Sequence, residues 1–210
     1  MSKKILSLVL CICMLTGVLS GCDGEKTQGK ESETEKATAK TLIPEEKQGG
    51  ILNVALSAVP ASLDPIKYTS VYESQIICMV CDTLLCYNSD MALSPSLATQ
   101  WKANEAGDVY TFTLRDDVYF QKGKYQDGRK MTAEDVKYSL ERSAKESALQ
   151  RLSMLDYCQV ISDTEIECHL KSPNASFLSA LNNGGNVIIP KEEAEGWGDG
   201  FSAHLVGTGP

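Results

Sequence analysis

Residues 109–115 read Val-Tyr-Thr-Phe-Thr-Leu-Arg, and this stretch decides the fold class. Large apolar side chains alternate along it with threonines, in the order Tyr110, Thr111, Phe112, Thr113 and Leu114. Successive side chains of a β-strand point to opposite faces, so the alternation predicts a strand with one buried and one solvated face. The chain is therefore expected to build a sheet with one face against a core.

The segment that follows predicts a second strand and a helix. A short strand is expected at residues 118–120, and a glycine-rich turn follows around Gly123. Residues 131–136 read MTAEDV, in which Thr132 suits the N-cap of a helix and Asp135 stands three residues later. That spacing is typical of a capping box. Strands and helices thus share one domain, which indicates a mixed α/β (α+β) fold.

Residues 158–170 (CQVISDTEIECHL) predict a β-hairpin that turns at residues 163–164. With a two-residue turn there, Cys158 would lie opposite His169. Cys158 and Cys168 would then face each other only if the strand register shifted by one residue. The sequence leaves open whether these two cysteines pair.

On the N-terminal side, residues 51–56 (ILNVAL) are apolar enough to predict a buried strand. Residues 57–65 contain two prolines and no period, so they are expected to form a loop. A helix is expected from Ser70 to about Cys86. Ser70 and Glu73 have the spacing of a capping box at its start.

The first 21 residues have the organisation of a secretory signal. Lys3 and Lys4 precede an apolar stretch at residues 5–18, which is too short to span a bilayer, since spanning takes about 20 apolar residues. Residues 19–22 read Leu-Ser-Gly-Cys, which resembles the lipobox of bacterial lipoproteins. The resemblance implies cleavage before Cys22, acylation of that residue, by palmitate among other chains, and anchoring to the cell membrane on its extracytoplasmic face.

Three parts are expected along the chain. Residues 1–21 form the signal peptide, residues 22–48 the lipidated cysteine and a tether, and residues 49–210 a folded domain. The tether is rich in acids and lysines and poor in apolar residues, so it is expected to be disordered.

Charge and cysteine content argue against a nucleic-acid-binding protein and against a disulfide-framework protein. The net charge is −8, and removal of Lys3 and Lys4 with the signal peptide lowers it to −10, which argues against a nucleic-acid partner. Of eight cysteines, two lie in the signal peptide and Cys22 is the lipidation site, which leaves five. An odd number leaves at least one thiol unpaired, so a disulfide framework is not expected.

The order of these segments resembles family 5 of the bacterial extracellular solute-binding proteins, the oligopeptide- and dipeptide-binding group of ABC importers. The matching segments are residues 63–65 (LDP), residues 93–98 (LSPSLA) before Trp101, residues 110–115 with Val118 and Phe120, residues 131–136 with Tyr138, residues 170–173 (LKSP), residues 177–178 (FL) and residues 206–210 (VGTGP). Two positions depart from the family pattern. Residues 120–123 read FQKG where Phe-His-Asp-Gly is usual, and Asp82 stands where glutamate is usual.

The resemblance implies a periplasmic-binding-protein-like type II fold, present here as its first lobe with an inserted subdomain and without the second lobe. Members of the family resemble two-lobed clamps that close on a solute and deliver it to a permease. The expected solute is a peptide. Nickel complexes and sugars are the alternatives within the same family.

Two loops are the candidate ligand-binding segments, because polar, glycine-rich or proline-bent loops are expected to border the cleft. Their residues are Ser57, Ala58, Val59 and Pro60, and Asn182, Asn183, Gly184 and Gly185. Ordinary connecting loops are the alternative interpretation. No cofactor, metal ligand or catalytic residue is predicted.

Two rival interpretations carry less support. Cys78 and Cys81 form a CxxC, but the predicted apolar helix around them and the presence of only two histidines favour buried structural cysteines over a metal site. A surface-anchored enzyme such as a hydrolase is the alternative from another functional class, but the sequence contains no Gly-x-Ser-x-Gly motif.

Overall fold

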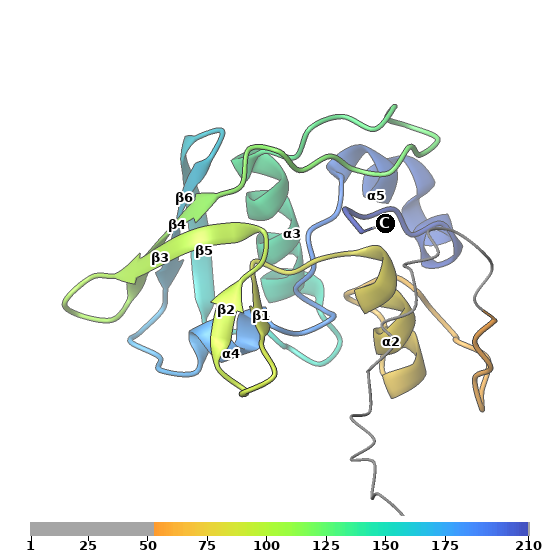
Figure 1. Cartoon of the computed structure of the whole chain (residues 1–210), viewed down its shortest axis with the longest axis horizontal. Helices are drawn as coiled ribbons and strands as arrows, with labels where there is room; N and C mark the ends of the chain where they lie inside the picture. The colour runs from red at the N-terminus through yellow and green to blue at the C-terminus, as the bar shows by residue number, and fades with distance from the viewer. Residues whose placement is uncertain (1–52, 210) are drawn as a thin grey trace, which may run out of the picture. The chain divides into compact units, whose positions relative to one another are not determined.

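A four-stranded antiparallel sheet lies against one long helix in the computed structural model, which describes residues 53–209 (Figure 1). The elements are α2 (Val71–Val80), β1 (Leu85–Tyr87), β2 (Leu93–Pro95), β3 (Ala98–Ala103), β4 (Val109–Leu114), α3 (Ala133–Glu146), β5 (Leu155–Ser162), β6 (Glu165–Leu170), α4 (Phe177–Leu181), α5 (Lys191–Trp197) and the 3₁₀ turn η1 (Gly198–Ala203). The sheet order is β3-β4-β6-β5, and β1 and β2 form a separate two-stranded ribbon. The mixed α/β class is confirmed.

The alternation at residues 109–115 predicts β4 correctly except at one threonine. Tyr110, Phe112 and Leu114 are buried and Thr113 is exposed, but Thr111, which was expected on the solvated face, is also buried. It lies between Lys102 of β3 and Glu167 of β6 in the middle of the sheet, and its hydroxyl donates to the Glu167 carboxylate at 3.4 Å. Phe112 lies opposite Ile166 of β6, and both side chains are fully buried. The inner face of the sheet packs with α3 into the larger of two apolar clusters.

Helix α3 begins where the capping box predicts. The Asp135 carboxylate accepts the backbone N–H of Thr132 at 2.9 Å, and the guanidinium of Arg129 donates to the same carboxylate. Arg129 also donates to Glu192 at 2.8 Å. One arginine therefore joins the turn before α3 to the first turn of α5.

Helix α2 also begins as predicted, but it ends earlier. Ser70 is its N-cap and forms the capping box with Glu73. The last helical residue is Val80, because the chain turns to an extended conformation at Cys81. The prediction of a helix to about Cys86 is therefore wrong. Apolar periodicity did not mark the end, since Cys81 and Leu84 keep the helical spacing from Ile77 beyond the last residue of the helix.

The prediction of a strand at residues 51–56 is wrong for residues 53–56, the part that the structure describes. Residues 53–56 form no strand, and Val54 is 54% exposed. A strand needs a partner for its N–H and C=O groups, and no strand of the described residues lies beside this segment. Residues 118–120 likewise form no strand, only a single bridge from Tyr119 to Lys130, although Val118 and Phe120 point into the core.

The hairpin at β5 and β6 turns where predicted, but its register differs. Ser162 lies opposite Glu165, as a two-residue turn requires, and the register then shifts by one between Val160 and Ser162. Ile161 is the extra residue of a β-bulge. Cys158 therefore lies opposite Cys168, and the predicted pairing of Cys158 with His169 is wrong.

The signal peptide, Cys22, the tether and the start of the folded domain at residues 49–52 lie outside the described residues. Between residues 53 and 209, no helix has both the length and the apolar character that crossing a membrane requires.

Candidate functional site

Helix α2 anchors both predicted binding segments, beginning with the loop at residues 57–60. The side chain of Glu73 is buried, and its carboxylate accepts four backbone N–H groups. The donors are Ala61 at 2.8 Å, Ser62 at 3.0 Å, Thr69 at 2.9 Å and Ser70 at 2.9 Å. These hydrogen bonds fasten the chain directly after residue 60 to the first turn of α2.

The same hydrogen bonds set the charge of Glu73. The N–H of Ser70, with those of Thr69, Ser62 and Ala61, stabilises the carboxylate and outweighs its burial, which lowers the pKa of Glu73 to about 2. Glu73 is therefore a fixed negative charge at the N-terminus of α2, where the helix dipole also favours an anion.

Residues 57–60 themselves lie in solvent. Three of the four residues are exposed, and the side chain of Val59 is 92% exposed. In Figure 1 this segment, drawn in orange, lies beside α2. An exposed segment with a firmly held end is accessible to a ligand that binds along its backbone.

Residues 182–185 follow α4 and pack against the side of α2. The hydroxyl of Tyr68 donates to Asn183 Oδ1 at 2.9 Å, and the N–H of Gly185 donates to the same oxygen at 3.0 Å. A Cβ at Gly184 would lie 2.9 Å from Ser74 Oγ and 3.4 Å from Cys78 Sγ, so the loop approaches the helix closely because this residue is glycine.

A small cavity of about 180 Å³ lies between this loop and the C-terminal end of α2. Its lining consists of Cys78, Cys81, Asp82, Thr83, Cys86, Ser96, Asn182, Asn183 and Gly184. None of residues 57–60 lines it. The structure thus brings both predicted segments onto α2, but it does not bring them into one cavity.

The CxxC within this region divides between two environments. Cys81 is buried, as predicted for a structural cysteine, whereas Cys78 is exposed, which the sequence did not predict. Full burial raises the pKa of the Cys81 thiol, and partial desolvation of the sulfur raises that of Cys78, so both thiols stay protonated at neutral pH. Among residues 53–209, no group of three or more cysteine, histidine or acidic residues is arranged to hold a metal ion.

The C-terminal segment forms a third contact with α2, which the sequence analysis missed. The N–H of Gly209 donates to the carbonyl of Val80 at 2.9 Å, and the Thr208 hydroxyl donates to Asp82 at 2.8 Å. A Cβ at Gly207 would collide with the backbone of Val80 and Cys81. The glycines on either side of Thr208 were the available signal, because close backbone approach requires glycine.

Gln121 holds the same segment from the other side. Its N–H donates to the carbonyl of Gly207 at 2.9 Å, and its side-chain amide donates to the carbonyl of Gly209 at 3.1 Å. Gln121 stands at one of the two positions that depart from the family pattern. It is therefore a packing residue of this region and not a free surface substitution.

A second missed contact fixes the loop before α2 to α3. Arg142 donates to both oxygens of Asp64 at 2.8 Å, and Asp64 is fully buried. Asp64 belongs to the Leu-Asp-Pro segment, whose role could not be read from neighbouring residues, since Arg142 is 78 positions away. The ion pair sets the position of the chain that leads into α2.

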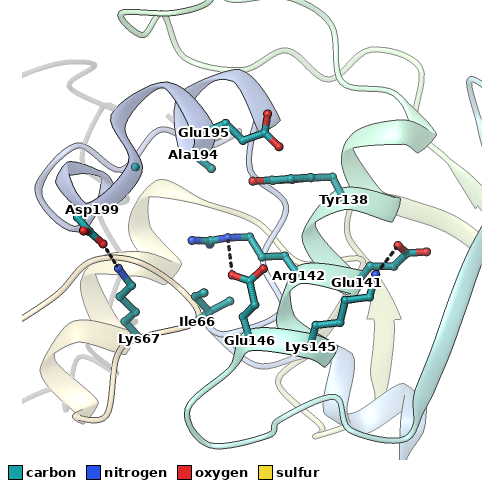
Figure 2. Close-up of a pocket in the computed structure, with 11 residues that line it drawn as sticks. Ile66, Lys67, Tyr138, Glu141, Arg142, Lys145, Glu146, Ala194, Glu195 and Asp199 are labelled. Atoms are coloured by element: carbon teal, nitrogen blue, oxygen red, sulfur yellow. Dashed lines mark hydrogen bonds and ion pairs between the residues drawn. The ribbon is translucent and has the colours of Figure 1, made fainter.

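Figure 2 shows a larger cavity, of about 580 Å³, between α3, α5 and the segment that contains Ile66 and Lys67. Its three basic side chains each face a carboxylate. These pairs are Lys67 with Asp199 at 3.2 Å, Lys145 with Glu141 at 3.4 Å and Arg142 with Glu146 at 3.8 Å. Neither predicted binding segment contributes to its lining.

The two predicted segments offer hydrogen-bonding groups to a ligand. Loop backbone, the amide side chains of Asn182 and Asn183 and two glycines can donate and accept hydrogen bonds. The two histidines stack on aromatic rings, His204 on Trp197 and His169 on Tyr157.

Comparison with known proteins gives one family. The family described as bacterial extracellular solute-binding proteins, family 5 Middle, matches residues 92–210, which is more than half of the chain. Di/tripeptide-binding protein 2 of Pseudomonas aeruginosa is 29% identical over 182 residues, which cover 76% of this chain and 34% of that protein. The nickel-binding periplasmic protein of Escherichia coli is 34% identical over 103 residues, which cover 49% of this chain and 20% of that protein.

A solved structure agrees with the described fold. The periplasmic binding protein DppA of Helicobacter pylori, in complex with the peptide STSA, superposes with a TM-score of 0.64 and 26% identity. The superposition covers 72% of this chain and 34% of DppA. The chain therefore has part of the periplasmic-binding-protein type II fold and spans about a third of the length of Di/tripeptide-binding protein 2 and of DppA.

Proposed function

This chain belongs to family 5 of the bacterial extracellular solute-binding proteins, and on that premise we propose that it captures peptides outside the membrane for an ABC importer. The family match over residues 92–210 carries the proposal. Peptides are preferred because the P. aeruginosa relative is a di/tripeptide-binding protein and the H. pylori structure holds a tetrapeptide. A permease subunit is the partner that receives the solute.

The binding cleft in this proposal is bordered by residues 57–60 and 182–185. The chain directly after the first segment is held on α2 by the hydrogen bonds of Ala61 and Ser62 to Glu73, and Gly184 of the second segment approaches Ser74 closely. An extended peptide would bind along the exposed backbone of residues 57–60 by adding as a strand, with specificity supplied elsewhere in the protein.

The experiment is a thermal-shift screen of the whole protein that carries this chain. Di- to tetrapeptides, sugars and nickel–histidine complexes are the candidate ligands. A ligand at a hundredfold excess over its Kd stabilises the folded state by about 2.7 kcal/mol, which is a shift of several degrees. A shift with peptides supports the proposal, whereas a shift with nickel complexes alone would favour the second candidate, which the E. coli nickel-binding relative suggests.

A backbone substitution tests the site itself. Ala58→Pro removes the N–H of an exposed residue, and loss of one strand-addition hydrogen bond is expected to weaken peptide binding by about tenfold. Ala58→Ser keeps the N–H and is the matched control. Equal peptide affinity of both variants in calorimetry would place the ligand away from residues 57–60.

The lipid anchor is a further part of the proposal. Residues 1–21 direct export, Cys22 carries the lipid, and residues 22–48 tether the binding domain to the outer face of the membrane. Growth with radiolabelled palmitate is expected to label the protein, and Cys22→Ser is expected to abolish the label. Cys13→Ser is the control within the signal segment. A labelled Cys22→Ser variant would contradict the anchor.

A further inference from the structure

The β5–β6 hairpin contains two cysteines that the register places face to face. Cys158 and Cys168 are directly opposite in the antiparallel ladder, and their Sγ atoms are 3.6 Å apart. Both are buried in the larger apolar cluster and both are free thiols. Cross-strand neighbours have Cα separations within the range that a disulfide bridges, and a sulfur–sulfur bond of about 2.0 Å needs only a small approach of the two atoms.

The bulge at Ile161 is what creates this juxtaposition. The two-residue turn alone would set Cys158 opposite His169, and the extra residue moves the register by one. Cys158 is also held from its other side, since its N–H donates to the Glu141 carboxylate of α3 at 3.0 Å. The pair is therefore a fixed feature of the fold and not a chance approach of two mobile side chains.

We propose that Cys158 and Cys168 form an intramolecular disulfide when the protein folds in the presence of a small-molecule disulfide oxidant. The thiolate of one cysteine attacks a sulfur of the oxidant, releases one thiolate and forms a mixed disulfide. The second cysteine's thiolate attacks the protein sulfur of that mixed disulfide and releases the other thiolate. The two protein thiols lose two electrons, the oxidant is reduced to two thiols, and the protons of the cysteines pass to the released thiolates.

Burial determines the stage of folding at which the disulfide forms. The neighbouring Cys158 thiol and burial raise the pKa of Cys168, so the folded, reduced protein holds few thiolates there. The exchange therefore takes place before α3 closes over the hairpin. Once formed, the bond is shielded from reductants by the same packing. Its formation does not depend on which solute the protein binds.

Peptide mapping tests the linkage directly. The full chain is refolded with oxidised glutathione, alkylated and digested. Trypsin releases residues 152–171 as one peptide that contains both cysteines, and cleavage after Glu165 or Glu167 then separates them. Two fragments that separate only on reduction identify the bond. Recovery of alkylated Cys158 and Cys168, or their pairing with other cysteines, would overturn the proposal.

Stability supplies the second measurement. The bond closes a short loop, and the oxidised protein is expected to melt roughly 5–10 °C above the reduced protein. The double variant Cys158→Ser/Cys168→Ser should show no such difference. Cys78→Ser, which alters an exposed thiol, should keep both the bond and the shift. A lower melting temperature for the oxidised protein would also overturn the proposal. Alkylation of the exported protein at harvest gives the same map without a refolding step.

Discussion

The sheet with α3 and the region around α2 are held together by different interactions. The sheet region has an apolar interior in which Phe112, Ile166 and Phe177 are fully buried. The α2 region has a smaller apolar cluster and is positioned by buried carboxylates, Asp64 and Glu73. Apolar packing is non-directional, whereas each carboxylate fixes particular backbone groups. Directional hydrogen bonds therefore fix the backbone geometry of the region with the candidate site, whereas apolar burial stabilises the sheet region.

The largest effect is expected in the sheet region. Phe112→Ala removes a fully buried ring and leaves a cavity, which is expected to lower the free energy of unfolding by about 3–5 kcal/mol. Thr113→Ala alters the exposed neighbour on the same strand and should change stability by less than about 0.5 kcal/mol. Urea denaturation at pH 7 measures both. Similar losses in the two variants would contradict the assignment of the buried face.

A similar loss in the free energy of unfolding, about 3 kcal/mol, is expected when a single charge is removed from the α2 region. Asp64→Asn leaves the guanidinium of Arg142 without its buried carboxylate. Asp199→Asn removes an exposed partner of Lys67 and is the control, since exposed ion pairs contribute little. If both substitutions cost the same in urea denaturation, the buried pair would not be what positions the loop.

Glu73→Gln is expected to cost about 2 kcal/mol at pH 7, because four N–H donors lose their charged acceptor. The pKa of Glu73 is about 2 in the folded protein and near 4.5 when unfolded, so its contribution is complete above about pH 5. The contribution is lost as the pH falls from about 5 to about 2.

The pH dependence separates this residue from other acids. The fall in the urea midpoint between pH 7 and pH 3 should be smaller for Glu73→Gln than for the unaltered protein. Glu195→Gln alters an exposed carboxylate of α5 and should keep the full pH dependence. An unchanged fall in Glu73→Gln would show that Glu73 does not accept these hydrogen bonds as a carboxylate.

The smallest effect on stability is expected at the second loop. Gly184→Ala places a Cβ near Ser74 Oγ and the Tyr68 hydroxyl, and small side-chain shifts relieve the contact at a cost of about 1 kcal/mol. Peptide affinity should fall more than stability if this loop borders the cleft. Gly200→Ala, whose Cβ meets only Trp197 at 3.5 Å, is the control. Unchanged affinity in Gly184→Ala would argue against the loop as a binding segment.

Sequence reasoning predicted part of the candidate site. It selected residues 57–60 and 182–185 as loops, and the structure shows both as loops, with residues 182–185 packed against α2. It did not find Asp64, Gln121 or the segment around Thr208, which fix the surroundings of α2. The sequence singled out the segments that contain them, and the glycines beside Thr208 indicated a close backbone approach. The contacts themselves could not be predicted, because each is made with a partner far along the chain.

Local secondary structure could be predicted from the sequence, because the interactions that cause it join residues only a few positions apart. The buried apolar positions of β4 and the caps at Ser70 and Thr132 depend on immediate neighbours, and the structure confirms them. The burial of Thr111 depends on the neighbouring strands, and the alternation did not predict it. The order of short motifs was likewise enough to indicate the family.

Only the tertiary structure decided which residues that are distant in the sequence come into contact. The bulge at Ile161 sets Cys158 against Cys168, and the turn at Cys81 ends α2 where Gly209 approaches Val80. Residues 53–56 form no strand because strand formation needs a partner outside the segment itself. Register, helix ends and strand partners depend on hydrogen bonds and packing across the fold, and these act between residues that the sequence keeps far apart.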